Sequence, residues 1–430
     1  MLIEFRVKNF RSFRDEQVLN LTASRIKDIE EGRVFSVDSS DSSDSSKSRL
    51  LKSAVIYGAN ASGKSNLLKA MAFMRSFVCG SAEGQAGDEI EVEPFRLDKK
   101  CADQPSSFEV HFIQAGVRYQ YGFSVDRSRV REEWLFAYPL GRPQRWFERT
   151  WDDNAGDMEW EFGPNFKGER AKLARMTREN ALYLSLGPKF NHPQLTPVFK
   201  WFRENLRGIM RLSARESLAH YTAMRCEDDS AFRERALQLL KDADFGIDGL
   251  EVERRTFSED ELPQDMPEEI KKSILKRMKG RKFFEVRTIH HMTDDGREVP
   301  FDLNEESDGT QNFFALIGPW LDVLNHGYTL FVDELESSMH PLLAKKLVSM
   351  FHDPNINTKG AQLVFTTHDT TLLDANLFRR DQVFFTEKDD RKGTHLFSLL
   401  EYSPRKNEAL QKGYLAGRYG ALPYLGDFRF

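Results

Sequence analysis

Short runs of alternating and continuous apolar residues mark the first elements of the chain. In MLIEFRVK (1–8), apolar and charged residues alternate with the period of a half-buried β-strand. A second short run at 18–21 predicts another strand of the same sheet. SAVIY (53–57) is continuously apolar, which is typical of a buried strand in a parallel sheet. Gly58 follows it directly, and residues 66–77 have the composition of a helix.

The C-terminal part of the chain alternates predicted strands with predicted helices. YTLFVDE (328–334), QLVFTTH (362–368) and QVFFTE (382–387) are apolar strand candidates, and a helix is expected to begin near residue 341. Such an alternation predicts a parallel sheet covered by helices. We therefore expect an α/β fold.

The middle of the chain has a different character. Residues 106–150 are rich in aromatic and β-branched residues and predict strands, as do residues 283–292. SVDSSDSSDSSKS (36–48) is of low complexity and is expected to form a mobile loop. From 166 to 245 the pattern is that of helices, with apolar residues at helical spacing in Phe199, Phe202, Leu206 and Ile209.

Composition narrows the class of protein. Among 430 residues, 40% are hydrophobic, which supplies a core and excludes wholesale disorder. A net charge of −5 excludes a globally basic nucleic-acid-binding protein. The charged N-terminus does not resemble a signal peptide, and no apolar run reaches the ~18 residues of a membrane span. Three cysteines lack paired spacing. We expect a cytoplasmic protein without a membrane partner.

GANASGKS (58–65) is the sharpest motif, because it matches the phosphate-binding loop G-x-x-x-x-G-K-[ST]. Such a loop surrounds phosphates with backbone N–H groups, and the helix that follows adds its positive N-terminal end. A glycine-rich turn with an incidental lysine is the alternative, but the flanking strand and helix favour ATP with Mg²⁺. The predicted nucleotide ligands are Gly58, Asn60, Gly63, Lys64, Ser65 and Asn66, with Ser65 also on the metal.

TLFVDELE (329–336) supplies acids at the end of an apolar strand. Asp333 would hold Mg²⁺ together with Ser65, and Glu334 would accept a proton from the attacking water. Solvated acids at a helix N-terminus are the alternative; the phosphate-binding loop favours the metal-site interpretation. The role of Glu336 stays open. Because 269 residues separate Lys64 from Asp333, a large insertion must lie between the two halves of the site.

Two further segments are candidates for contacts with phosphate. His368 ends the strand QLVFTTH and could donate a hydrogen bond to the terminal phosphate, although a histidine at a strand end is often structural. Ser307 and Gly309 lie just before a helix-like apolar stripe and could form a second anion-binding surface, or an ordinary helix cap without a ligand. The predicted catalytic residues are Glu334, His368 and Lys64.

Taken together, these motifs resemble the ABC-type ATPase heads of the SMC, RecF and OLD group. The resemblance rests on NFRSF (9–13), GANASGKS, SDGTQ (307–311), LFVDELESSMHP (330–341) and TTH (366–368). More narrowly, DELESSMHPLLAKKLV, VFFTEKDDRKGTHLFSLLEY and GYLAGRYGALPYL are similar to RloA/AbiL-type ATPases of bacterial antiphage and abortive-infection systems. The likeness covers residues 1–125 and 290–430.

The resemblance implies a mixed or parallel sheet with flanking helices, an N-terminal antiparallel β lobe and a largely helical insertion. The expected division is an N-terminal ATPase lobe (1–165), the insertion (166–282) and a C-terminal ATPase lobe (283–430). It also implies a homodimer or higher homo-oligomer in which Ser307 and Gly309 of one copy cap the ATP of the other. Arg11 is expected near the nucleotide, and residues 337–340 are expected to connect the two sites.

The resemblance also suggests a function. OLD-type proteins have a C-terminal nuclease, but 62 residues follow His368 and hold too few acids for a two-metal site. We therefore expect an ATP-driven dimerisation switch that controls a separate effector, a nuclease or a toxin, in antiphage defence. The alternatives are a RecF-like DNA clamp for repair and a scaffold that does not hydrolyse ATP. The basic residues 271–282 could contact nucleic acid or form a solvated helix.

Overall fold

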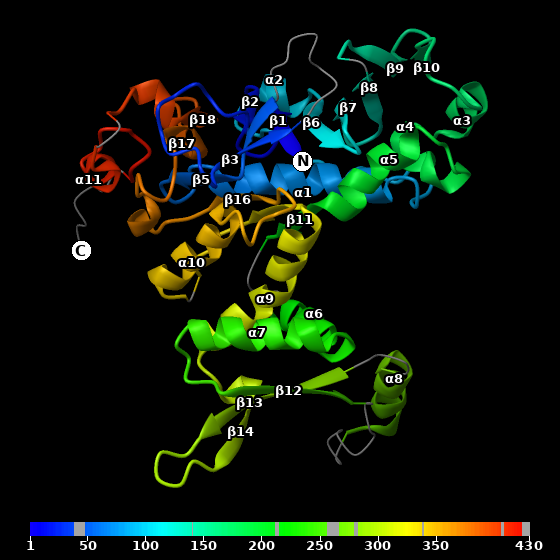
Figure 1. The fold of residues 1–430 in the computed structure, drawn as a ribbon. Coiled ribbons are helices and arrows are strands. Elements are labelled where there is room, and N and C mark those ends of the chain that lie inside the picture. Colours follow the sequence, from blue (N-terminus) through cyan, green and yellow to red (C-terminus); the bar gives the residue numbers. More distant parts are fainter. Residues whose placement is uncertain are drawn as a thin grey trace, which may run out of the picture. The chain divides into compact units, whose positions relative to one another are not determined.

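The chain forms two compact units in a computed structural model (Figure 1). Unit 1 comprises Met1–Arg211, Leu324–Glu336 and Ala344–Phe430, and unit 2 comprises Leu212–Val323 and Ser337–Leu343. The three-part division at 165 and 282 stays a prediction. The structure describes residues 1–37, 48–139, 141–210, 215–255, 266–278, 283–337, 339–405 and 408–423. Most of the expected loop at 36–48, and part of the basic cluster at 271–282, lie outside these residues.

An antiparallel sheet of seven strands forms the N-terminal lobe of unit 1, in the order β10-β9-β8-β7-β6-β1-β2. Side chains of β1 and β6 alternate between buried and partly exposed positions, as the sequence pattern of the first strand predicted. The strands are β1 (Leu2–Lys8), β2 (Gln17–Asn20), β6 (Ser106–Gln114), β7 (Val117–Val125), β8 (Val130–Tyr138), β9 (Gln144–Asp152) and β10 (Asp157–Phe162).

A second sheet of unit 1 has six strands in the order β11-β15-β16-β5-β17-β18. The first five pair in parallel and β18 is antiparallel to β17, so the predicted α/β fold is confirmed. The strands are β5 (Ser53–Gly58), β11 (Leu206–Ile209), β15 (Thr329–Val332), β16 (Gln362–Thr366), β17 (Val383–Lys388) and β18 (Thr394–Ser398). All residues of β5, β15 and β16 are buried, which agrees with their continuously apolar sequences.

The helical spacing that ended at Leu206 and Ile209 led to a wrong prediction for this segment. Leu206–Ile209 forms strand β11, which pairs in parallel with β15 at the edge of the second sheet. Both apolar residues are buried there, and the backbone groups between them bond to a neighbouring strand. Periodicity over a few residues cannot reveal such a partner, because that partner lies more than 100 residues away in the sequence.

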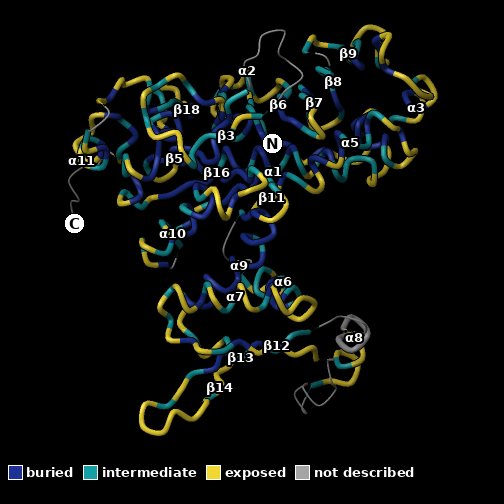
Figure 2. Tube along the Cα trace, in the orientation of Figure 1, coloured by how far each residue is buried: buried dark blue, intermediate teal, exposed yellow. Residues whose placement is uncertain are grey.

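One hydrophobic core joins the two sheets of unit 1. It contains buried residues of β1, β6 to β9 and helix α1 (Lys64–Gly80), together with Phe331, Val364 and Phe384 of the second sheet. Figure 2 shows the traces of β5 and β16 as buried, whereas α1 mixes buried and partly exposed residues. Gln362 of β16 also accepts a hydrogen bond from Leu2 N at 2.6 Å and donates one to Leu2 O at 2.9 Å. The N-terminal strand is thereby fixed to the sheet that holds the motifs.

Short elements complete unit 1. Strands β3 and β4 pair with each other, and the helices connect or flank the two sheets (Figure 1). These elements are β3 (Val34–Val37), β4 (Ser48–Leu51), α2 (Lys99–Ala102), α3 (Arg170–Met176), α4 (Tyr183–Leu186), α5 (Leu195–Lys200), α11 (Leu410–Leu415) and α10 (Pro341–His352), whose first three residues belong to unit 2.

Unit 2 combines helices with an antiparallel sheet in the order β12-β13-β14. Thr222 accepts a hydrogen bond from Gly318 N at 3.0 Å and lies 3.1 Å from Ala315 O, which joins α6 to α9. A Cβ atom at Gly318 would lie 2.5 Å from Thr222 Oγ1, so this close packing requires glycine. The elements are α6 (Arg215–Asp228), α7 (Ser230–Asp242), β12 (Gly249–Arg255), α8 (Glu268–Met278), β13 (Phe283–His291), β14 (Glu298–Asp302) and α9 (Asp308–His326), which ends in unit 1.

No helix within the described ranges is both long and apolar enough to cross a lipid bilayer.

Candidate nucleotide site

Three motifs of unit 1 meet at one edge of the second sheet because their strands run parallel. Ile56 of β5 lies opposite Thr366 of β16, and Phe365 of β16 lies opposite Val332 of β15. The phosphate-binding loop, His368 and the acid pair each follow the carboxyl end of one of these neighbouring strands. Ligands of open α/β sheets bind at this kind of edge.

The glycines of the loop are required by close packing as well as by backbone conformation. Gly63 precedes helix α1 with φ 117°, a conformation that residues with a Cβ atom rarely adopt. A Cβ atom at Gly63 would lie 2.3 Å from Thr394 Oγ1, and one at Gly58 would lie 2.5 Å from Thr386 O. Strands β17 and β18 therefore lie against the loop and fix its path, a constraint that the motif alone did not reveal.

Lys64 lies inside the loop, where its ammonium group donates to Gly58 O at 2.8 Å and to Ala59 O at 3.1 Å. The residue is 5% exposed. Burial lowers the pKa of Lys64 to about 8, against the opposing effect of the carboxylates at 334, 333 and 336. The lysine and these acids therefore share one electrostatic environment, although 269 residues separate Lys64 from Asp333 in the sequence.

Thr366 organises the acid pair. Its buried hydroxyl donates to Asp333 Oδ1 at 2.7 Å and accepts from Glu334 N at 2.8 Å. Glu334 has φ 53°, an uncommon conformation for a residue with a side chain, and the hydrogen bond to its N–H helps to hold it there. The Glu334 side chain is 53% exposed, so water can reach its carboxylate. Sequence reasoning did not assign a role to Thr366.

His368 lies beside Glu334, with Nε2 4.0 Å from Glu334 Oε1. Burial and the charge of Lys64 lower the pKa of His368, while the nearby acids oppose this effect. A neutral imidazole is therefore favoured at neutral pH. Glu336, whose role stayed open from the sequence, accepts a hydrogen bond from His368 N at 2.6 Å and so ties the acid loop to the histidine loop.

The NFRSF turn contacts the phosphate-binding loop through Ser12. Ser12 Oγ accepts a hydrogen bond from Asn66 at 2.8 Å and lies 2.8 Å from Thr394 Oγ1, which itself lies 2.7 Å from Ser62 O. Arg11 forms an ion pair with Glu93, and its expected approach to the nucleotide stays a prediction.

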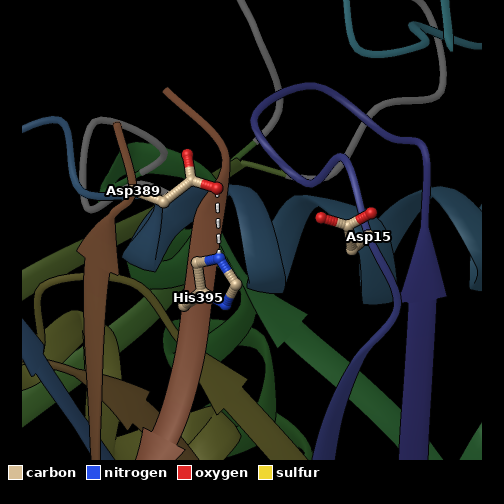
Figure 3. Close-up of side chains that lie close together, drawn as sticks. All are labelled: Asp15, Asp389 and His395. Atoms are coloured by element: carbon tan, nitrogen blue, oxygen red, sulfur yellow. Dashed lines mark hydrogen bonds and ion pairs between the residues drawn. The ribbon is translucent and has the colours of Figure 1, made fainter. Parts of the chain in front are cut away.

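A group of charged residues secures the next part of this turn. Asp15, Asp389 and His395 lie close together (Figure 3), and His395 Nε2 is 3.3 Å from Asp389 Oδ2. The Arg14 guanidinium lies 2.7 Å from Asp15 and 2.8 Å from Asp389. Since Arg14 already pairs with both acids, we interpret this group as an ion-pair network that anchors the turn to the β17–β18 hairpin.

Ser307 and Gly309 belong to unit 2, whereas the loop, the acids and His368 belong to unit 1. Ser307 Oγ accepts from Thr310 N at 3.2 Å and thus caps helix α9. The exposed Asp308 pairs with Arg215 at 2.7 Å. Ser337, at the start of the expected connecting loop, accepts from Asn312 at 3.5 Å, and Ser338 lies outside the described residues.

The residues of this edge fit ATP with Mg²⁺. A helix N-terminus and a buried lysine favour a polyphosphate, because both present positive charge to it. Ser65 is partly exposed at the first turn of α1, and Asp333 is partly exposed at the end of β15. A hydroxyl and a carboxylate are oxygen ligands of the kind that Mg²⁺ prefers.

Comparison with known proteins gives low-similarity matches to solved structures. The SMC head bound to the C-winged helix domain of ScpA matches with TM-score 0.43 and 14% identity, covering 94% of this chain and 99% of that one. The SMC head domain from Thermotoga maritima matches with TM-score 0.40 and 12% identity, covering 92% and 98%. The recombination mediator RecF with ATP matches with TM-score 0.35 and 16% identity, covering 93% and 99%.

No curated protein matches the chain. A family model does match, over residues 53–374, and its description is "AAA domain, putative AbiEii toxin, Type IV TA system". The matched range begins at strand β5 and extends past His368, so it includes the loop, the insertion and the acid pair. The predicted P-loop ATPase group is thereby confirmed, and the chain belongs to this family of AAA-domain proteins.

Proposed function

We propose that the chain binds and hydrolyses ATP in a Mg²⁺-dependent reaction, and that the reaction drives a dimerisation switch. One observation supports the chemistry above all others. The parallel register of β15, β16 and β5 brings Asp333 and Glu334, His368 and Lys64 to the same sheet edge.

Each residue has a distinct part in the proposed reaction. Backbone N–H groups of the loop and the Lys64 ammonium hold the phosphates of ATP. Ser65 and Asp333 would hold Mg²⁺, which supplies charge neutralisation for the phosphate oxygens. Glu334 accepts the proton of the attacking water, and its exposed carboxylate and supported backbone suit that role. His368 donates a hydrogen bond to the terminal phosphate.

The second copy of the chain completes the proposed site. Ser307 and Gly309 of the partner would contact the terminal phosphate at the N-terminus of α9, where backbone N–H groups and the helix dipole favour anions. The exposure of Ser307 and Asp308 leaves this end of the helix accessible. Hydrolysis would then remove the group that joins the two copies.

The proposed output is control of a separate effector, a nuclease or a toxin, in bacterial antiphage defence. The family description, which names a toxin and a type IV TA system, supports this biological setting. The narrower likeness to abortive-infection ATPases in the sequence supports it too.

Replacing Glu334 with Gln tests the enzymatic part. The variant should bind ATP as the wild type does, hydrolyse it ~10²- to 10⁴-fold more slowly, and accumulate as an ATP-bound dimer. Phosphate release, equilibrium binding of ATP and light scattering with and without ATP measure the three quantities. Lys64→Ala is the matched control, because it should lose binding and dimerisation together. Unchanged hydrolysis by Glu334→Gln would remove Glu334 from its proposed role.

The same trapped variant distinguishes an effector switch from a DNA clamp. Glu334→Gln with ATP is mixed with duplex DNA, and retention is measured at several salt concentrations. Absent or ATP-independent retention agrees with the effector switch. Retention that requires ATP and falls steeply with salt would instead support the RecF-like clamp.

A further inference from the structure

Glu306 stands directly before Ser307 and is held by strand β13 of the same unit. Its side chain is 9% exposed, so the carboxylate is nearly buried. Thr288 donates to Glu306 Oε1 at 2.5 Å, and His290 Nε2 lies 2.8 Å from the same oxygen. A buried carboxylate is costly unless donors surround it, and β13 provides two.

The backbone around Glu306 is held from the opposite direction by helix α9. Gln311 donates to Glu306 O at 2.7 Å and to Asn304 O at 3.3 Å. Its own N–H donates to Ser307 O at 3.0 Å. The segment 304–307 is therefore fixed between a strand and the first turn of a helix. Ser307 emerges from this segment with its hydroxyl at the N-terminus of α9.

We propose that Glu306, held by Thr288 and His290, is a positioning residue that presents Ser307 and Gly309 to the ATP of a second copy. This inference rests on the proposed function, because it assumes that Ser307 acts in the partner's site. Glu306 itself does not touch the nucleotide. Its carboxylate sets where the α9 N-terminus lies relative to β13, and an anion-binding helix end acts only when its N–H groups point at the phosphate.

An alternative role for Glu306 is a favourable interaction of its negative charge with the dipole of helix α9, which an acid before a helix N-terminus makes in general. That role would need neither Thr288 nor His290. The two roles therefore predict different effects at position 290. Loss of the His290 donor should impair hydrolysis if Glu306 positions Ser307, and it should leave hydrolysis unchanged if Glu306 serves only the dipole.

The first test measures kcat and the affinity for ATP in four variants. Glu306→Gln and His290→Ala should lower kcat by ~10- to 100-fold, since small displacements at a site cost up to that much. Affinity of the isolated chain for ATP should not change, because the phosphate-binding loop lies in unit 1. His290→Gln, which retains a donor, should recover part of the rate. His291→Ala is the matched control, because that neighbouring histidine lies 2.7 Å from Asp248 instead.

The second test uses mixed dimers. Glu334→Gln and Glu306→Ala, combined before ATP is added, are each expected to hydrolyse ATP at a small fraction of the wild-type rate, but a mixed dimer contains one site with an intact Glu334 and an intact Ser307 segment. Mixing equal amounts should restore about a quarter of the wild-type rate, since half of the two-fold symmetric dimers are mixed and each has one complete site. Absence of any recovery would overturn the proposal that Glu306 acts on the partner's site.

The outcomes separate this inference from the function on which it rests. If the wild type fails to hydrolyse ATP, the proposed function fails. If the wild type hydrolyses ATP and Glu306→Gln does so at the same rate, the positioning role alone is wrong. Loss of ATP affinity in Glu306→Gln, measured on protein with wild-type circular dichroism, would also contradict it, since the effect would then not be confined to the trans contact.

Discussion

Thr366→Val offers a sharp test of how the acid pair is organised. Valine has nearly the shape of threonine, so the substitution removes one hydroxyl from a fully buried position and leaves the packing in place. The Asp333 carboxylate then loses a donor at 2.7 Å, and the Glu334 N–H loses an acceptor at 2.8 Å.

The magnitude follows from these two hydrogen bonds. A bond to a charged group contributes ~1.5–3 kcal/mol and a neutral bond ~1 kcal/mol. Because Asp333 is half-buried and Glu334 is exposed, water can partly replace both lost hydrogen bonds. We therefore expect the free energy of unfolding to fall by about 2–3 kcal/mol. If the same amount is lost from the transition state for hydrolysis, kcat falls by ~30- to 150-fold. ATP binding should persist, since Lys64 and Ser65 are unaffected.

Urea unfolding, phosphate release and equilibrium ATP binding measure these effects separately. Thr366→Ser is the matched control, because it retains the hydroxyl and removes a methyl group worth ~1 kcal/mol. Wild-type kcat in Thr366→Val would refute the reasoning. Equal losses of kcat in the Val and Ser variants would refute it as well, because packing and not the hydroxyl would then be responsible.

Two further predictions concern stability. Burial, together with the positive charges of Arg33 and Lys52, lowers the pKa of His352 to about 3. Below pH ~6.5 the unfolded chain therefore takes up a proton that the folded chain does not, and the free energy of unfolding decreases as the pH is lowered. At pH 5 this histidine lowers the free energy of unfolding by about 2 kcal/mol. Urea unfolding at pH 7 and pH 5 should show that His352→Gln removes this acid-dependent loss, whereas the same change at the exposed His340 should not. Equal acid sensitivity of the wild type and His352→Gln would contradict the role of His352. Gly63→Ala should destabilise by about 2–5 kcal/mol, through its positive φ and the contact with Thr394. Gly87→Ala is the control for the cost of the positive φ alone, because Gly87 has φ 86° and open space around it. Equal losses of the free energy of unfolding in the two variants, measured by urea unfolding, would exclude the contact with Thr394 as a cause.

The sequence by itself determined the local elements of the site and their chemistry. A strand, a glycine-rich loop and a helix follow one another at 53–80, and acids or a histidine end the apolar strands at 329 and 362. These features could be predicted because each depends on neighbours in the chain: periodicity sets which residues are buried, and glycine sets which turn is accessible.

Tertiary structure decided what depends on distant partners. Leu206–Ile209 has the spacing of a helix but forms a strand, because β15 offers it backbone partners. Thr366 became an organiser of Asp333 and Glu334 through the order β15-β16-β5, and Glu306 became a buried carboxylate through the pairing of β13 with β14. Hydrogen bonds and close contacts act over a few ångströms in space, so the sequence separation that hides them has no bearing on their strength.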